Sequence, residues 1–187
     1  MADINNLLAE SRQEMSQVID SYNIELQKIR VGAVNVEVIK AISVEVYGSY
    51  IPLFQVATIS SPSANTVIIT PWDKSNLRNI GSAIEAEFKG EVNPNIKDDA
   101  VYLNFPPLTQ EKKEEFVKFL KEKSEQFRQR LRDVRQTFKS LLDEMKKNSE
   151  APEDEIFRGL EELDKITKEF TEKINELYEA KKTQLLK

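Results

Sequence analysis

The sequence predicts an α+β protein: an elongated antiparallel three-helix bundle with a small, β-rich α/β domain inserted between its first and second helices. Apolar residues recur at steps of three, four and seven in three long segments, as in amphipathic helices. Between the first two of these segments, residues 31–108 hold four of the five glycines and six of the seven prolines. Apolar residues alternate with polar ones in that interval, which is typical of strands.

Residues 3–30, residues 109–148 and a segment that opens at Pro152 are the three expected helices. Asp3 and Thr109 are suitable caps for the first two, and Pro152 suits the first helical position of the third. The apolar stripes are Ile4, Leu8, Met15, Val18, Tyr22 and Ile29; Phe116, Leu120, Phe127, Leu131, Val134, Phe138, Leu141 and Met145; and Ile156, Leu160, Leu163, Phe170, Ile174 and Leu177. Narrow stripes cannot be buried on isolated helices, so we expect one bundle within a monomer.

The inserted segment contains several strand patterns and one helix pattern. We expect strands at Ser43–Tyr47, Thr66–Thr70 and Ala100–Asn104, with a weaker candidate at Val56–Ile59. The helix is marked by Leu77, Ile80, Ile84 and Phe88, with Asp73 or Ser75 as its cap, and Asn93-Pro94-Asn95 indicates a turn. The predicted division is therefore residues 1–30 with 106–187 for the bundle, and residues 31–105 for the inserted domain.

Two chain crossings join the inserted domain to the bundle. The first is Arg30, Val31 and Gly32, and the second runs through Phe105 and Pro106. Glycine permits unusual backbone angles and proline stops a strand. Two crossings side by side predict a hinge with one preferred axis, because small inserted domains rarely share large apolar interfaces with their hosts. The alternative is a pair of domain boundaries without motion.

The chain has no cysteine and no histidine. Disulfides, thiolate nucleophiles and Cys/His zinc sites are therefore excluded, and so is the commonest general acid–base. The acidic residues are scattered, and the compact cluster Glu153-Asp154-Glu155 resembles a helix start. We expect neither catalytic residues nor a metal or other cofactor. A magnesium-dependent hydrolase remains the least favoured alternative.

The formal net charge is −5, which argues weakly against an anionic partner. No apolar run approaches the ~18 residues of a membrane span, and the N-terminus lacks the basic start and apolar stretch of a secretory leader. These features predict a cytoplasmic protein without membrane contact.

Basic residues gather on one part of the second long helix. Arg128, Arg132, Arg135 and Lys139 are spaced by four, three and four residues, which places them in one column beside the apolar stripe. Neither Arg132 nor Arg135 has a carboxylate three or four residues away, whereas the same count pairs Arg128 with Glu125, Arg130 with Asp133 and Lys139 with Asp143. Counterion release and arginine–phosphate contacts would favour binding of an anionic partner to this column. The alternative is a surface paired by carboxylates within the bundle.

Several stretches, in order and spanning nearly the whole chain, resemble the bacterial ribosome recycling factor family. They are Leu26-Gln27-Lys28-Ile29-Arg30-Val31-Gly32, Val44-Glu45-Val46-Tyr47-Gly48 with Pro52-Leu53 and Gln55-Val56-Ala57, Ile69-Thr70-Pro71-Trp72-Asp73-Lys74-Ser75, Asn93-Pro94-Asn95, Phe105-Pro106-Pro107-Leu108-Thr109, and Arg132-Asp133-Val134-Arg135. The family pattern differs at Ala33, Tyr102 and Gln136, where it usually has basic residues.

The resemblance implies an L-shaped molecule that binds the large-subunit side of the post-termination ribosome. It also implies cooperation with elongation factor G, whose GTP hydrolysis drives the subunits apart and leads to release of messenger and transfer RNA. Contacts with ribosomal RNA are expected from Lys28, Arg30, Arg128, Arg132, Arg135 and Lys139. Two alternatives stay open: a coiled-coil adaptor or chaperone-like protein that binds only proteins, and a factor of the same fold that parks on idle ribosomes.

Overall fold

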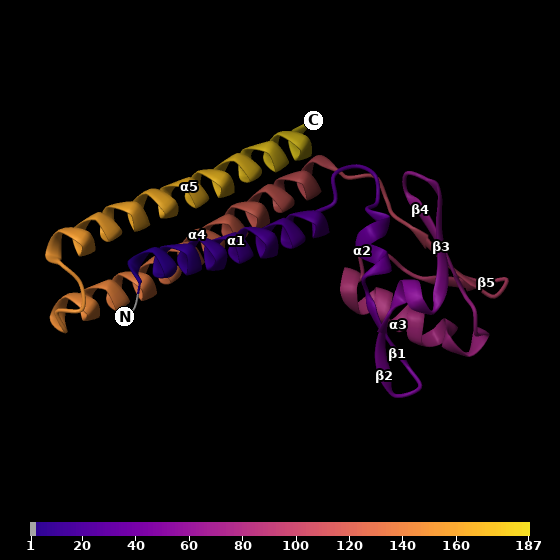
Figure 1. Cartoon of the computed structure of the whole chain (residues 1–187). Helices are drawn as coiled ribbons and strands as arrows, with labels where there is room; N and C mark the ends of the chain where they lie inside the picture. Colours follow the sequence, from indigo (N-terminus) through magenta and orange to yellow (C-terminus); the bar gives the residue numbers. More distant parts are fainter. Residues whose placement is uncertain (1–2) are drawn as a thin grey trace. The chain divides into compact units, whose positions relative to one another are not determined.

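The computed structural model describes residues 3–187, and the chain divides into two compact units (Figure 1). The bundle unit consists of Met1–Leu26 and Lys113–Lys187, and the small domain consists of Gln27–Lys112. These limits lie a few residues from the expected ones, because the small domain also takes in the last residues of the first helix and the start of the second. No helix in residues 3–187 has the length and apolar character needed to cross a membrane.

Three long helices form the bundle unit: α1 (Ile4–Lys28), α4 (Gln110–Lys147) and α5 (Glu153–Leu186). Tyr22 of α1 meets Ser124 of α4, whereas Ile4 and Leu142 both lie against Gly159 of α5. Contacts that advance along one helix while they retreat along the other show that α1 and α4 are antiparallel. Arg128 contacts Asn175 and Arg135 contacts Asp164, which makes α4 and α5 antiparallel in the same way.

The helix starts follow the expected signals at two of three places. The Asp3 side chain accepts a hydrogen bond from the amide of Asn5 at 2.9 Å, and Thr109 accepts one from the amide of Lys112 at 3.2 Å. The expected position of Pro152 is wrong by one residue. It has an extended backbone and serves as the N-cap, so that α5 begins at Glu153.

The bundle core contains most of the predicted apolar stripes. Met15, Tyr22, Leu131 and Ile174 have no exposed surface. One stripe position is wrong: Leu141 is exposed, and Leu142 takes its place in the core. A step of four from Phe138 keeps the side chain on the buried face, because the helix repeats every 3.6 residues.

A polar contact lies within this core. The Tyr22 hydroxyl and the Ser124 hydroxyl are 2.5 Å apart, and Ser124 donates to the carbonyl of Leu120 at 2.7 Å. Since the serine proton is used on Leu120, the tyrosine must donate to Ser124. Burial raises the pKa of Tyr22. The contact fixes the register of α1 against α4, because an unpaired buried hydroxyl is costly.

The small domain combines two antiparallel sheets with short helices. β1 (Ser43–Val46) pairs with β2 (Ser49–Pro52), and the second sheet has the order β3-β4-β6-β5. The strands of the second sheet are β3 (Ala57–Ser63), β4 (Thr66–Pro71), β5 (Asn95–Lys97) and β6 (Ala100–Asn104). The helical elements are α2 (Val36–Lys40), η1 (Leu53–Gln55), η2 (Lys74–Asn76) and α3 (Leu77–Phe88).

The expected strands and the expected helix are confirmed. α2, β2 and β5 were not predicted, because elements of three to five residues carry too few positions for a periodic pattern. β5 begins at Asn95, inside the stretch expected to be a turn. Asp73 caps η2 rather than α3 directly, since its side chain accepts from the amide of Ser75 at 2.9 Å. The core of this domain is formed by Ile39, Val44, Leu53, Val67, Ile69, Ile80, Ile84, Val101 and Leu103, among others.

Candidate nucleic-acid interface

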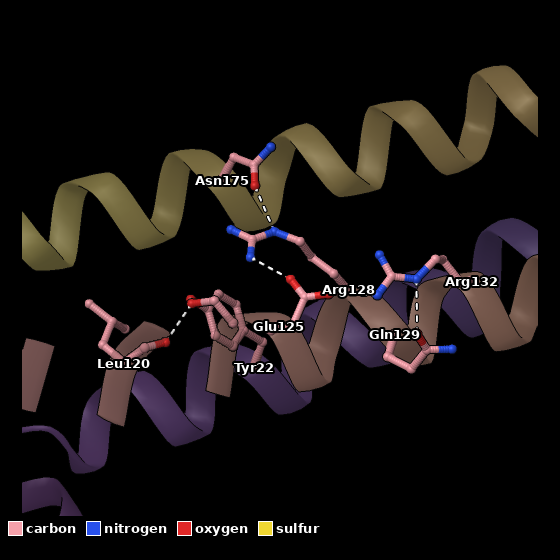
Figure 2. A network of polar contacts seen from close by, with 8 residues as sticks. Tyr22, Leu120, Glu125, Arg128, Gln129, Arg132 and Asn175 are labelled. Carbon is pink, nitrogen blue, oxygen red and sulfur yellow. Dashed lines mark hydrogen bonds and ion pairs between the residues drawn. The ribbon is translucent and has the colours of Figure 1, made fainter. Parts of the chain in front are cut away.

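The four predicted basic residues of α4 lie on one helix, and three of them are held by contacts with other side chains. Arg128 is half-buried. Its Nε donates to Oδ1 of Asn175 on α5 at 2.9 Å, and its Nη1 donates to Oε2 of Glu125 at 3.2 Å (Figure 2). The guanidinium also lies 5.8 Å from the ring centroid of Tyr178. Arg128 is therefore fixed between α4 and α5, and its pairing with Glu125 confirms the expectation from spacing.

Glu125 binds a second arginine. Its Oε1 accepts a hydrogen bond from Nη2 of Arg132 at 2.6 Å, while Nε of Arg132 donates to Gln129 at 3.0 Å (Figure 2). Arg132 and Arg128 together lower the pKa of Glu125, with Arg132 as the larger cause. One carboxylate thus bridges two members of the column.

Arg135 has a partner on the neighbouring helix. Its Nε donates to Oδ1 of Asp164 on α5 at 2.6 Å. Within residues 3–187, the side chain of Lys139 has no hydrogen bond or ion pair. The column is therefore paired at its first three positions and open at its last.

These contacts correct the pairing expected from sequence. The sequence has no carboxylate three or four residues from Arg132 or Arg135, and a surface paired by carboxylates within the bundle was left open as the alternative. The structure gives each arginine one carboxylate partner, as that alternative requires. The partners lie seven residues away on the same helix and on another helix, outside the three- and four-residue count. Conversely, in the described part of the chain neither Arg130 nor Lys139 has its expected carboxylate. Arg130 instead lies 4.9 Å from the ring centroid of Phe127, and Gln129 donates to Asp133.

The paired column keeps a positive balance. Arg128, Arg132, Arg135 and Lys139 carry four positive charges, and Glu125 and Asp164 supply two negative ones. Arg132 and both carboxylates are exposed, and ion pairs of this kind contribute only about 0–1 kcal/mol. Arg135 uses only its Nε in a recorded contact, so its other guanidinium donors can face a phosphate. An anionic partner can therefore replace the internal carboxylates at small cost.

Lys28 and Arg30 belong to the small domain and form a separate group. Arg30 is engaged by its own domain: Nε donates to the carbonyl of Gly32 at 2.9 Å, and Nη2 donates to the carbonyl of Pro106 at 2.6 Å and to Asn65 at 3.3 Å. The guanidinium also lies 5.5 Å from the ring centroid of Phe105. Burial lowers the pKa of Arg30, while the Glu91 carboxylate raises it.

Arg30 thus ties the two predicted crossings together. It binds Gly32 in the first crossing and Pro106 in the second, and the amide of Phe105 donates to the carbonyl of Asn65 at 2.8 Å. Gly32 has a φ of +72°, a backbone angle that favours glycine. In this arrangement two of the Arg30 nitrogens are directed at protein carbonyls and an amide rather than at solvent.

Two partners of the column were not found from sequence. Asn175 and Asp164 lie on α5, and their approach to α4 depends on the register of two long helices. No spacing within one helix reveals that register. The apolar stripe of each helix gives the face that meets the other, but not the axial offset between them.

Comparisons with known proteins agree with the resemblance noted in the sequence. Residues 22–186 match the family model described as Ribosome recycling factor. The chain is 37% identical over 186 residues to the ribosome-recycling factor of Deinococcus radiodurans, covering 100% of both chains. It is 35% identical to that of Campylobacter lari, covering 98% of this chain and 99% of the relative.

Solved structures give the same result. A solution structure of a ribosome recycling factor matches with a TM-score of 0.77 and 31% identity over 100% of this chain and 98% of the other. A second match, with a TM-score of 0.60 and 32% identity, covers 98% of this chain and 99% of the other. It is described as models for the Thermus thermophilus ribosome recycling factor and the Escherichia coli elongation factor G bound to the E. coli post-termination complex.

Proposed function

Because the chain belongs to the ribosome recycling factor family, we propose that it binds the post-termination ribosome and, with elongation factor G and GTP, promotes separation of the subunits and release of messenger and transfer RNA. The description of the related T. thermophilus factor names both the post-termination complex and elongation factor G. This separation of the subunits takes place in the cytoplasm, where bacterial ribosomes are. GTP hydrolysis belongs to the elongation factor, and this chain contributes binding and positioning.

The bundle docks on ribosomal RNA of the large subunit through Arg128, Arg132, Arg135 and Lys139. The observation that carries this proposal is the geometry of α4, which presents four cations in one column against two exposed carboxylates. A rigid helix side cannot easily reach the base edges of folded RNA, so the contacts are mainly to phosphates. Arg128 is the most constrained member, and Arg132 and Arg135 are the residues that exchange an internal carboxylate for a phosphate.

Sedimentation with purified ribosomes tests the docking face. Arg132→Ala and Arg135→Ala should each weaken binding, and each should reduce the salt dependence by about one unit of slope or less. Both residues lie on the surface, so stability should change by no more than about 0.5 kcal/mol. Arg130→Ala is the matched control. Arg130 is offset by two residues, which places it on the opposite side of the helix. Binding by both variants as tight as the parent's at low and high salt would overturn the docking face.

The two crossings serve as the hinge of the small domain. Support comes from the Arg30 contacts, which hold Gly32 and Pro106 side by side and so limit rotation to one axis. Lys28 and Arg30 are both expected from the resemblance to bind RNA, but their surroundings in the structure differ. Arg30 acts first as the residue that fixes the crossings, whereas Lys28 lies exposed in the last turn of α1.

A factor that parks on idle ribosomes would show the same binding. A subunit-splitting assay separates the two roles: the parent chain with elongation factor G and GTP should convert post-termination ribosomes into free subunits. Binding without splitting would favour parking.

A further inference from the structure

At one end of the bundle unit, α4 and α5 extend beyond the start of α1 (Figure 1). α1 begins at Ile4, which lies against Gly159, whereas α5 begins at Glu153, more than one turn before that contact. A Cβ at position 159 would lie 2.9 Å from Cγ2 of Ile4, so glycine is what lets the two helices approach this closely. The unequal lengths of the helices leave space beside the ends of α4 and α5.

This space is a hollow of about 910 Å³, which we name the terminal hollow. It lies between the first residues of α1, the turn from α4 to α5, and the first turns of α5. Part of its surface is apolar and comes from Ile4 and Leu8, which are half-buried, and from the buried Gly159. The carboxylates that line it are those of Asp3, Glu150, Glu155 and Glu162.

The charges of the terminal hollow do not balance. Arg158 is the cation of its lining, and Nη2 of this side chain lies 3.7 Å from Oδ2 of Asp154, a further carboxylate outside the lining. In the part of the chain that the structure describes, the Glu155 side chain has neither an ion pair nor a hydrogen bond. The hollow is therefore acidic, in contrast with the basic column on α4, and a cationic ligand would complement it.

The carboxylates are spread along the hollow rather than gathered at one point. Glu155 and Glu162 are two turns apart on α5, which separates them by about 10 Å along the helix axis. Within residues 3–187, no group of three or more acidic side chains is arranged to hold a metal ion. A ligand that suits this spacing carries several positive charges at intervals along a flexible chain.

We propose that the terminal hollow binds a linear polyamine, in which ammonium groups are joined by short methylene chains. The ammonium groups pair with Glu155, with Glu162 and with the carboxylates of the α1 start and the turn. The methylene groups cover Ile4 and Leu8, so that apolar surface is removed from water on both sides. This site goes beyond the proposed function, because the ligand binds the chain without a ribosome.

Titration of the isotopically labelled full chain with spermidine, followed by nuclear magnetic resonance, tests the site. At low ionic strength, the amide resonances of Asn5, Ala151 and Gly159 should shift along one saturating curve, because these residues line the hollow. The resonance of Gln136 on α4 should stay in place. Shifts that do not saturate, or that affect all acidic segments of the chain alike, would show only loose counterion association and overturn the proposal.

Two further cations separate a polyamine site from the alternatives. Hexaamminecobalt(III) carries the same charge as spermidine but no methylene groups. It should bind several-fold more weakly, since burial of one methylene group corresponds to about a fourfold change in affinity. Equal affinity would mean that the apolar surface plays no part and would contradict the proposal. Trilysine has the same net charge again, and tighter binding by this peptide than by spermidine would assign the hollow to a basic polypeptide instead.

Substitutions locate the site on the chain. Glu155→Gln and Glu162→Gln should each weaken spermidine binding about two- to fivefold, the range of an exposed ion pair. Glu172→Gln is the matched control, because it makes the same charge change at an exposed residue of α5 outside the hollow, and it should leave the affinity unchanged. Circular dichroism verifies that each variant is folded. Equal losses in all three variants, or no loss in the first two, would overturn the proposal.

These measurements use the chain without ribosomes. A negative result therefore contradicts the terminal hollow and leaves the proposed function as it is. Conversely, failure of the parent chain to sediment with ribosomes contradicts the proposed function alone.

Discussion

Glu125 holds Arg132 from seven residues away, with 2.6 Å between Oε1 and Nη2, and with its second oxygen it also holds Arg128. A single carboxylate therefore restrains the two N-terminal members of the basic column. This contact competes directly with any phosphate that approaches the same guanidinium groups. The strength of docking depends on the balance between the two.

Glu125→Gln should strengthen ribosome binding at low salt. The substitution removes one negative charge and frees two guanidinium groups, and an exposed ion pair of this kind corresponds to at most about a fivefold change in affinity. Sedimentation over a range of salt concentrations provides the measurement. Glu162→Gln is the control, because Glu162 pairs with Lys165 on α5 at 3.4 Å and lies outside the column. Equal effects of the two substitutions would show that only net charge matters.

The contact between Tyr22 and Ser124 should be coupled in stability. Tyr22→Phe removes a hydroxyl that donates one hydrogen bond, at a cost of about 1 kcal/mol. Ser124→Ala leaves the buried tyrosine hydroxyl without an acceptor, and its cost should be larger, about 2 kcal/mol. The double variant should lose less than the sum. Urea denaturation of the four proteins measures these differences, and strict additivity would contradict the contact.

Arg30→Met should loosen the two crossings. Methionine keeps part of the apolar contact with Phe105 but removes the donors to Gly32, Asn65 and Pro106. We expect faster amide hydrogen exchange at Phe105 and Val34, whose amides bond to Asn65 and Ala64. Exchange at residues of α5 should not change, and this is the internal control.

The same substitution tests the hinge. The chain has no cysteine, so cysteines introduced at Lys168 and Glu87 can carry two spin labels, one in each unit. Pulsed electron paramagnetic resonance should give a broad distribution of distances between the two spin labels in the parent protein and a broader one in Arg30→Met. A single narrow distance in both would argue against a hinge.

Stability should be flat near neutral pH and fall on both sides. Hydrogen bonds from Arg132, Lys146 and Lys173 are the largest causes that lower the pKa of Glu125, Glu153 and Glu169, respectively. A carboxyl with a lowered folded pKa binds fewer protons in the folded than in the unfolded state. Its contribution is present above the ordinary pKa of 4.5 and is lost as pH falls through the folded value. Without histidine or cysteine, no ordinary side chain titrates between these carboxyls and the alkaline range.

Tyr22 contributes to the alkaline side, together with Tyr47 and Lys146, whose pKa values are raised by hydrogen bonds with Asp73 and Glu153. Burial raises the folded pKa of Tyr22 above the ordinary 10.0, so the folded protein keeps a proton that the unfolded chain releases. Stability should therefore fall as pH rises past 10.0. Urea midpoints measured across the pH range test both limbs. Tyr22→Phe should flatten the alkaline limb, and Glu169→Gln the acid one. An alkaline limb unchanged in Tyr22→Phe would contradict this assignment.

The sequence alone determined which segments form the long helices and the longer strands, and which face of each is buried. Periodicity in Met15, Val18 and Tyr22 gives the buried side of α1, and alternation in Val44 and Val46 gives that of β1. These signals are local, because the period of the backbone and the separation of apolar from polar residues are both written along one segment. The elements α2, β2 and β5 are too short to show a periodic pattern, so the sequence did not predict them.

Only the tertiary structure decided how the charged residues pair. The basic column was visible in the spacing of Arg128, Arg132 and Arg135, but its carboxylates were not. Asp164 reaches Arg135 from another helix, and Glu125 reaches Arg132 over seven residues. Long side chains can turn toward any acceptor within their reach, and that choice depends on the axial offset of packed helices and on competing partners. Burial fixes the direction of an apolar side chain along its own helix, whereas a surface charge finds its partner only after the helices have packed.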